Sequence, residues 1–146
     1  MAYEILENNL DEKDIIIAGI QENGSIIAEN IRQLLAEISQ INTTLISISL
    51  DKRHPKEITL SEKADFNDKV ILIVDDVANS GKTLLYALKP FLDFHPKKIQ
   101  ILVLVERTHK AYPIQPDYVG LSVATTLVEH IFVEVKNNEV NGAWME

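Results

Sequence analysis

Short apolar runs alternate with segments of helical periodicity along the chain. Residues 14–20 are rich in β-branched side chains and predict a strand, and apolar positions recur at helical spacing through residues 25–38. Residues 43–50 predict a second strand. Residues 51–67 are charged and lack apolar periodicity, so we expect a mobile loop there.

The second half of the chain continues this alternation. Residues 70–74 form an unbroken apolar run, which is typical of a strand covered on both faces of a parallel sheet. Residues 81–93 predict a helix whose last turn bends at Pro90, and residues 99–105 and 130–135 predict two further strands. Strands that alternate with helices indicate an α/β fold, with a central parallel sheet flanked by helices. Ligands of such folds bind beyond the carboxyl ends of the strands.

Composition narrows the class of protein. A chain of 146 residues with 46% hydrophobic and 25% charged residues predicts one globular domain over residues 1–146. The absence of cysteine excludes a disulfide framework and thiolate metal sites, and residues 1–7 carry carboxylates where a signal peptide would be basic. We therefore expect a cytoplasmic protein. A formal net charge of -8 with only three arginines argues against extensive contacts with a nucleic-acid backbone.

The most informative chemistry lies where the apolar run of residues 70–74 ends. Two adjacent carboxylates, Asp75 and Asp76, are followed by a short loop of small and hydroxylic residues that leads into the predicted helix. A helix start offers unpaired N–H groups to an anion, and the hydroxyls of Ser80 and Thr83 complete a phosphate pocket. Carboxylates repel phosphate but suit vicinal hydroxyls or a bound Mg²⁺. A phosphate beside a diol describes a ribose 5-phosphate.

Other interpretations of this segment fit less well. Each residue alone also fits a solvated turn or a helix cap, but the order of strand, carboxylates and hydroxylic loop favours a ligand site. Residues 81–83 resemble the tail of a Walker A loop, yet Asp76 stands where that motif needs glycine. Residues 71–76 also resemble the first strand of a response regulator, but the Lys-Pro pair at residues 89–90 follows too soon for that family. We reject both interpretations.

Residues 74–83 resemble the PRPP (phosphoribosyl pyrophosphate) motif of type I phosphoribosyltransferases, and residues 105–109 and 113–120 are similar to the C-terminal half of the PyrR family. The resemblance implies a Rossmann-like type I fold with a small hood. It implies that Asp75 and Asp76 are the catalytic pair, hold the ribose hydroxyls, and contact Mg²⁺ only indirectly, through ribose and PRPP. The remaining residues of the motif are implied to bind the 5′-phosphate: Val77, Ala78, Asn79, Ser80, Gly81, Lys82 and Thr83.

Three further regions receive roles from the same resemblance. The turn implied to bind pyrophosphate consists of Gly19, Ile20, Gln21, Glu22, Asn23 and Gly24. Lys52 and Arg53 are implied to form a flexible lid over pyrophosphate, although they also fit a solvated charged loop. Arg107, Val123 and Thr125 are implied to contact the nucleobase, with a surface ion pair as the alternative for Arg107. The resemblance also implies a homodimer, and it places Met1 within the family's N-terminal helix, whose earlier part is absent.

PyrR proteins are bifunctional: many are uracil phosphoribosyltransferases, and some bind RNA to regulate pyrimidine genes. We therefore predict transfer of phosphoribosyl from PRPP to a nucleobase. Uracil is favoured because Glu106 and Asn79 replace the Lys and the acid-base Asp of purine-using relatives. Two alternatives stay open: a regulatory protein that binds nucleotide or RNA with little catalysis, and a purine salvage enzyme. The acidic balance disfavours RNA, while residues 21–23 lack the basic side chains of PyrR enzymes, which favours a regulator.

Overall fold

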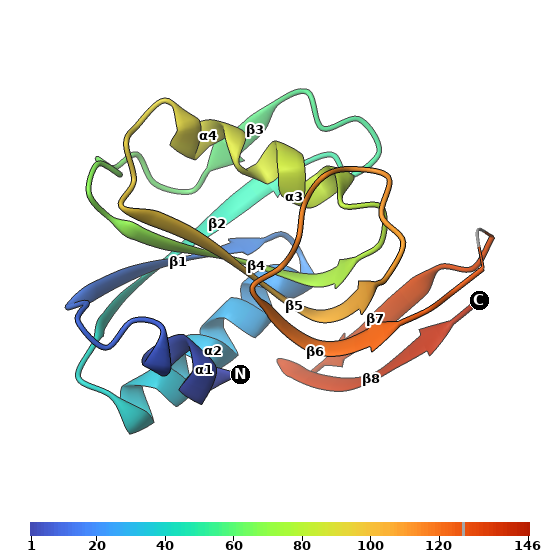
Figure 1. The fold of residues 1–146 in the computed structure, drawn as a ribbon, viewed down its shortest axis with the longest axis horizontal. Helices are drawn as coiled ribbons and strands as arrows, with labels where there is room; N and C mark the ends of the chain where they lie inside the picture. The colour runs from blue at the N-terminus through green and yellow to red at the C-terminus, as the bar shows by residue number, and fades with distance from the viewer. Residues whose placement is uncertain (127) are drawn as a thin grey trace.

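The computed structural model describes residues 1–126 and 128–146, which form a six-stranded sheet with helices on both faces and a separate two-stranded hairpin (Figure 1). The strand order in the large sheet is β3-β2-β1-β4-β5-β6. All its strands run parallel except β3, which pairs antiparallel at the edge. The strands are β1 (Asp14–Ile20), β2 (Asn42–Leu50), β3 (Ile58–Leu60), β4 (Val70–Ala78), β5 (Lys98–Arg107) and β6 (Tyr118–Val123).

Helices cover both faces of this sheet, as Figure 1 shows. One face carries α1 (Ala2–Glu7) and α2 (Asn23–Ile38), and the other carries α3 (Lys82–Ala87) and α4 (Lys89–Leu92). Because side chains alternate along a strand, even-numbered residues of β4 such as Leu72 pack towards α2, and odd-numbered ones such as Ile73 towards α3. This two-sided burial explains why β4 begins as an unbroken apolar run.

The hairpin, which we call the hood, consists of β7 (Ile131–Lys136) and β8 (Glu139–Met145). Asn137 and Asn138 both have positive φ angles, as a tight turn between antiparallel strands requires. Two β7 side chains, Ile131 and Val133, pack against Val105 of β5, whereas β8 is exposed along its whole length. The apolar contacts between the hood and the large sheet therefore come from one face of β7.

The predicted α/β fold with a mostly parallel central sheet, flanking helices and a small hood is confirmed. Two elements have other lengths than the sequence predicts. β4 continues beyond residue 74 to Ala78, because its last residues keep pairing with β5. The helix predicted over residues 81–93 is two short helices that meet at Leu88, because Pro90 has no N–H to continue the helical hydrogen bonds.

Other departures concern the edges of the fold. The predicted loop at residues 51–67 contains β3, a three-residue strand too short for a periodic signal. The strand predicted at residues 130–135 exists but belongs to the hood rather than to the parallel sheet. Strands β6 and β8 were not predicted; β8 has no buried face, so no alternation marks it. None of the helices in the described part of the chain combines the length and apolar character required to span a bilayer.

The carboxyl end of β4 extends past its neighbour β1. Pairing between these strands ends at Gly19 and Val74, because the chain turns away from the sheet after β1 to start α2. Gly24 lies so close to β4 that a Cβ atom there would be 2.6 Å from the carbonyl oxygen of Val74. The turn between β1 and α2 is therefore packed directly against the point where Asp75 and Asp76 emerge.

This close approach predicts that Gly24→Ala destabilises the fold. The added methyl group meets backbone atoms that cannot rotate away, so we expect the unfolding free energy to fall by about 1–3 kcal/mol. Gly142→Ala is the matched control, because a methyl group added there on β8 would have no heavy atom within 4 Å. Chemical denaturation of both variants measures the difference, and equal stabilities for the two would contradict the packing described here.

Candidate functional site

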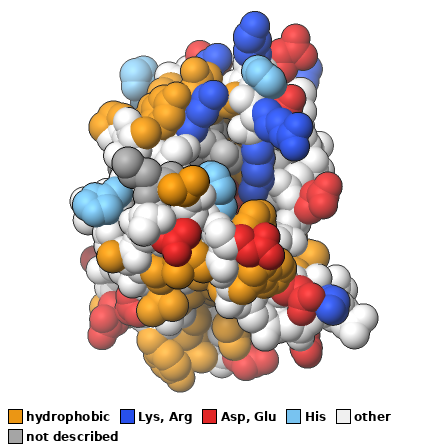
Figure 2. Space-filling model, turned by 90° about the vertical axis from the view of Figure 1, so that its right-hand side faces the viewer, with side chains coloured by type: hydrophobic (Ala, Val, Ile, Leu, Met, Phe, Trp, Pro, Cys, Tyr) orange, Lys and Arg blue, Asp and Glu red, His pale blue; other side chains and the backbone are white. Residues whose placement is uncertain are grey.

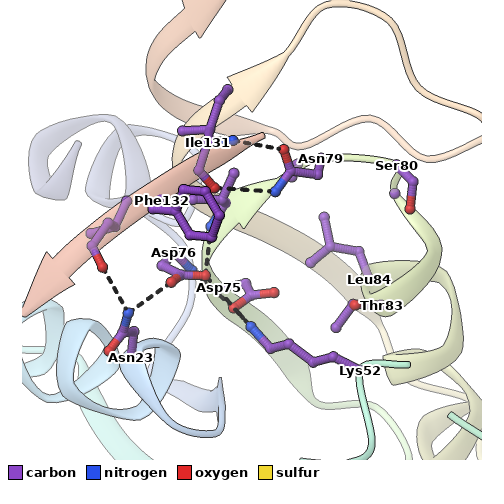
Figure 3. A pocket seen from close by; sticks show the side chains of 14 residues that line it. Asn23, Lys52, Asp75, Asp76, Asn79, Ser80, Thr83, Leu84, Ile131 and Phe132 are labelled. Carbon is purple, nitrogen blue, oxygen red and sulfur yellow. Dashed lines mark hydrogen bonds and ion pairs between the residues drawn. The ribbon is translucent and has the colours of Figure 1, made fainter. Parts of the chain in front are cut away.

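A cavity of about 280 Å³ lies at the carboxyl edge of the sheet. Its walls come from the end of β4, the loop that leads into α3, the start of α2, the segment after β2, and β7 (Figure 3). The residues that line it are Asn23, Lys52, Asp75, Asp76, Val77, Ala78, Asn79, Ser80, Gly81, Thr83, Leu84, Ile131, Phe132 and Val133.

Asp75 is the most deeply buried charged residue of this cavity, with a relative exposure of 1%. Its Oδ1 atom accepts hydrogen bonds from the Asp76 N–H (2.9 Å) and from the Lys52 Nζ (3.2 Å). Its Oδ2 atom is buried and has no partner among the described residues. Burial raises the pKa of Asp75 to about 7, against the opposing charge of Lys52. A buried carboxyl oxygen without a partner is costly, and a ligand hydroxyl in the cavity would satisfy it.

Asp76 is held in one orientation from both sides. Its Oδ1 atom accepts the Val77 N–H at 2.8 Å, and its Oδ2 atom accepts the Asn23 side-chain amide at 2.8 Å. Adjacent residues of a strand point to opposite faces, so Asp76 faces the start of α2 while Asp75 faces the side of α3. Together the two carboxylates present acceptor oxygens on both sides of the strand end.

Lys52 connects the two carboxylates. Its Nζ atom lies 3.2 Å from Asp75 Oδ1 and 3.6 Å from Asp76 Oδ1. Burial alone would lower the pKa of Lys52, but the charges of Asp75 and Asp76 outweigh burial and raise it. The neighbouring Arg53 lines neither this cavity nor the adjoining one; its side chain is exposed, and its backbone N–H donates a hydrogen bond to Asp51. Of the two residues that the resemblance assigns to a lid, Lys52 therefore lines the cavity and Arg53 does not; the lid itself stays a prediction.

The loop between β4 and α3 forms the other end of the cavity. Gly81 has a φ of 82°, a left-handed conformation that favours glycine, and a Cβ atom there would lie 2.5 Å from the Ile114 side chain. The Ser80 carbonyl accepts the N–H groups of Ala111 and Tyr112, so a distant loop fixes this one. Such a left-handed turn before a helix directs successive N–H groups into a concave site that suits an anion.

The hydroxyl-bearing residues of this loop, Ser80 and Thr83, line the cavity, whereas Lys82 does not. The Ser80 hydroxyl also accepts the Lys82 N–H at 3.2 Å, which helps to hold the loop in its curved shape. The curved loop and its two hydroxyl-bearing residues therefore lie next to the pair of carboxylates. That this loop binds the 5′-phosphate stays a prediction.

A second cavity of about 250 Å³ adjoins the first and is lined by Gln21, Glu22, Asn23, Lys52 and Asp76. Three of these residues, Asn23, Lys52 and Asp76, line both cavities. Among the described residues that line either cavity, Lys52 is the sole cation. The other residues of the predicted pyrophosphate turn line neither cavity. Gly19 pairs with Val74, Ile20 is buried, and Gly24 packs against β4.

The residues predicted to contact the nucleobase lie together, but they do not line the cavity. Arg107 at the end of β5 pairs with Val123 of β6 and is only 9% exposed. Its guanidinium donates hydrogen bonds to the Thr125 hydroxyl and to the Thr126 carbonyl. The surface ion pair considered for Arg107 is therefore not what the structure shows; Arg107 holds the segment that follows β6.

Four cavity residues were not assigned to the site from the sequence: Leu84, Ile131, Phe132 and Val133. Three of them belong to β7, whose apolar alternation reveals a strand but not the surface on which it packs. Glu106, which replaces the lysine of purine-using relatives, does not line the cavity. It accepts bonds from Lys110 (2.9 Å) and Ser122 (2.7 Å); although burial opposes ionisation, these donors hold its pKa below the usual range.

Residues 1–138 match the model of the phosphoribosyl transferase domain family. The bifunctional protein PyrR of Bacillus pumilus is 33% identical over 153 aligned positions, which cover 97% of this chain and 84% of the relative. The bifunctional protein PyrR of Streptococcus pneumoniae is 32% identical over 140 positions, covering 92% of this chain and 81% of the relative.

Two solved phosphoribosyltransferases have the same fold as this chain. A hypoxanthine-guanine phosphoribosyltransferase from Bacillus anthracis superposes with a TM-score of 0.68 at 21% identity, covering 84% of this chain and 72% of that one. The hypoxanthine phosphoribosyltransferase of Trypanosoma cruzi gives a TM-score of 0.72 at 15% identity, with coverages of 84% and 73%. At these identities the likeness establishes the fold alone.

The raised pKa of Asp75 predicts a pH-dependent cost to folding. In the unfolded chain this carboxyl titrates near 3.8, and in the folded protein near 7. The folded state therefore binds this proton more tightly than the unfolded chain does. The stabilisation that comes from the protonated Asp75 carboxyl is full below pH 4 and is lost as the pH rises through 7. The loss is at most about 4 kcal/mol.

Asp75→Asn removes this titration. We expect the variant to gain stability over the unmodified protein as the pH is raised from 4 to 8, measured by chemical denaturation at each pH. A stability difference that is the same at both pH values would show that Asp75 does not titrate as described.

Proposed function

Because the chain belongs to the phosphoribosyltransferase family, and within it to the PyrR proteins, we propose that it transfers the phosphoribosyl group of PRPP to uracil and releases pyrophosphate. The observation that carries this proposal is the pair Asp75 and Asp76, with its unpartnered buried oxygen, beside an anion-binding loop in one cavity. Carboxylates that can accept hydrogen bonds from hydroxyls, next to a loop that suits a phosphate, match the two ends of a ribose 5-phosphate.

In this assignment Asp75 and Asp76 accept hydrogen bonds from the ribose hydroxyls, and residues 77–83 surround the 5′-phosphate. The bond between C1′ and pyrophosphate breaks as the uracil nitrogen attacks, and no covalent nucleophile of the protein is required. The protein contributes by fixing the ribose against an approaching base and by stabilising the departing charge.

Mg²⁺ is the proposed cofactor. No group of three or more metal-ligating side chains occurs in the described residues, and the two carboxylates alone offer too few ligands for a fully protein-held ion. The chemistry of the site fits an ion that Asp75 and Asp76 would hold indirectly, through ribose and PRPP. Such an ion supplies neutralising charge to the pyrophosphate.

We assign Lys52 two positions. In the described structure its ammonium neutralises Asp75 and Asp76, at the place where ribose hydroxyls would bind. A ligand that binds these carboxylates displaces Lys52, which lies on the boundary of the second cavity and becomes available to pyrophosphate there. Arg53, on the same exposed segment, follows Lys52 as the outer part of the lid.

We place the nucleobase on the side of the cavity walled by β7. Ile131 and Val133 supply this wall, and Arg107 acts on it indirectly by holding Thr125 and Thr126 at the start of the segment that leads to β7. Val123 anchors the same segment at the end of β6. The protein takes PRPP and a nucleobase as its small-molecule partners, and we expect it to act as a cytoplasmic homodimer.

A regulatory role is the second candidate, because Glu22 lines the cavity proposed for pyrophosphate and would repel it. The relatives are described as bifunctional. Nucleotide is the better ligand for such a role than RNA. On the face seen in Figure 2, most basic side chains lie in the upper half, but acidic and apolar side chains interrupt them and dominate the lower half.

Incubation with Mg²⁺-PRPP and uracil, hypoxanthine, guanine or orotate tests the proposal. We expect uridine 5′-monophosphate (UMP) from uracil, and we expect Asp75→Asn and Asp76→Asn to lower its rate of formation by about 100-fold or more. A different preferred base would replace uracil in the proposal. No product from any base, together with thermal stabilisation by UMP, would identify a nucleotide-binding regulator instead.

Lys52→Met tests the two positions of Lys52. UMP lacks pyrophosphate, so removing the competing ammonium should tighten UMP binding, whereas turnover of PRPP should fall by about 10- to 100-fold. The exposed Lys56 of the same segment provides the control, and Lys56→Met should change neither quantity. Calorimetric titration measures UMP binding, and initial rates measure turnover. Weaker UMP binding to Lys52→Met would contradict the displacement of Lys52 by the ligand.

A further inference from the structure

The hood depends on few contacts for its position. A two-stranded hairpin is marginally stable by itself in water, so its placement over the cavity must come from the rest of the protein. Its buried apolar contacts are those of Ile131 and Val133 with Val105, and β8 is exposed. The partly buried side chains packed around this small cluster are Val77, Leu104, Val123 and Val135. Apolar contact is non-directional, and Val135 lies on the same side of β7. A slide of two residues along β7 would therefore keep an apolar face on the sheet.

Hydrogen bonds from two asparagines define one register. The Asn79 side chain accepts the Ile131 N–H and donates to the Ile131 carbonyl, both at 3.4 Å. Asn23 donates to the Val133 carbonyl at 3.2 Å. Figure 3 shows both side chains directed at β7, one from the end of β4 and one from the start of α2.

The contacted backbone groups are those on the free edge of β7. His130 and Glu146 exchange both backbone hydrogen bonds, so in this antiparallel pair the groups of residues 130, 132 and 134 face β8. The backbone groups of Ile131 and Val133 therefore point away from β8, toward the asparagines. The Asn79 carboxamide exchanges two hydrogen bonds with the backbone of Ile131, as a residue of a neighbouring β-strand would.

Asn23 also links the hood to the carboxylates. Its side-chain amide carries two protons, of which one goes to Asp76 Oδ2 at 2.8 Å and the other to the Val133 carbonyl. The orientation of Asp76 and the position of β7 are thus fixed by one side chain.

We propose that Asn23 and Asn79 are positioning residues that form a two-point clip, which sets the register of the hood over the cavity and, through Asn23, the orientation of Asp76. The Asn79 side chain makes its hydrogen bonds to the hood alone, whereas the Asn23 side chain bonds both the hood and the carboxylate. The clip itself stands on the contacts above; its effect on ligands rests on the proposed function, with the base on the β7 side.

Amide hydrogen exchange of the free protein tests the clip without any ligand. In Asn79→Ala the Ile131 amide loses its acceptor, so we expect its exchange to accelerate by about tenfold or more. The Phe132 amide faces β8 and should change less. Asn30→Ala is the matched control, because Asn30 bonds the Asn138 carbonyl at 3.3 Å at the far end of the same hood. Equal Ile131 exchange in Asn79→Ala and Asn30→Ala would overturn the clip.

Ligand binding separates the two asparagines. In Asn79→Ala we expect affinity for UMP to fall by at least about fivefold more than affinity for ribose 5-phosphate, because the displaced hood forms the base side. Asn23→Ala should weaken both ligands. Asn23→Asp has the same size but places a carboxylate against Asp76, so it should weaken the binding of both ligands more than Asn23→Ala does. If Asn23→Asp weakens binding no more than Asn23→Ala, Asn23 only fills space, and the proposal is contradicted.

Should the unmodified protein bind neither ligand, the proposed function fails, while the exchange experiment still decides the clip. Should both ligands bind and Asn79→Ala affect them equally, the hood is not the base side, and this part of the inference is wrong.

Discussion

The site is organised around a carboxylate that lies at the end of the buried stretch of β4, residues 70–75. Asp75 continues the apolar run of β4, so its burial is a direct consequence of the strand that centres the fold. The cost of burying this charge is visible in its raised pKa and in the ammonium of Lys52 beside it. A structure that needed only stability would place an apolar side chain here, as residues 70–74 of β4 do. The ligand contact that we propose for this carboxylate accounts for its presence at a buried position.

The topology explains how distant parts of the chain meet at this carboxylate. Parallel strands end at the same edge of the sheet, and β4 reaches beyond β1, so the turn after β1 and the loop after β4 flank the same two residues. The hood closes the remaining side and is secured by Asn23 and Asn79 from those two segments. One strand end therefore brings together the three parts of the site that we propose hold the phosphate, the ribose hydroxyls and the base.

Local signals were sufficient for the central elements and for the core of the site. Residues 70–83 form one contiguous segment, so strand, carboxylates and hydroxylic loop are all visible in the sequence before their geometry is known. What the sequence does not disclose is pairing between distant residues. Asn23 and Asp76 are 53 residues apart, and Asn23 and Val133 are 110 apart. The contribution of β7 follows only from where the hood packs, which no local pattern encodes.

The central claim is that Asp75 and Asp76 recognise the hydroxyls of a ribose whose phosphate lies in the neighbouring loop. Calorimetric titration with UMP and with 2′,3′-dideoxyuridine 5′-monophosphate compares ligands that differ only in those hydroxyls. The account predicts that UMP binds at least about tenfold more tightly, and that this preference disappears in Asp76→Asn. Equal affinities of the unmodified protein for the two nucleotides would contradict it.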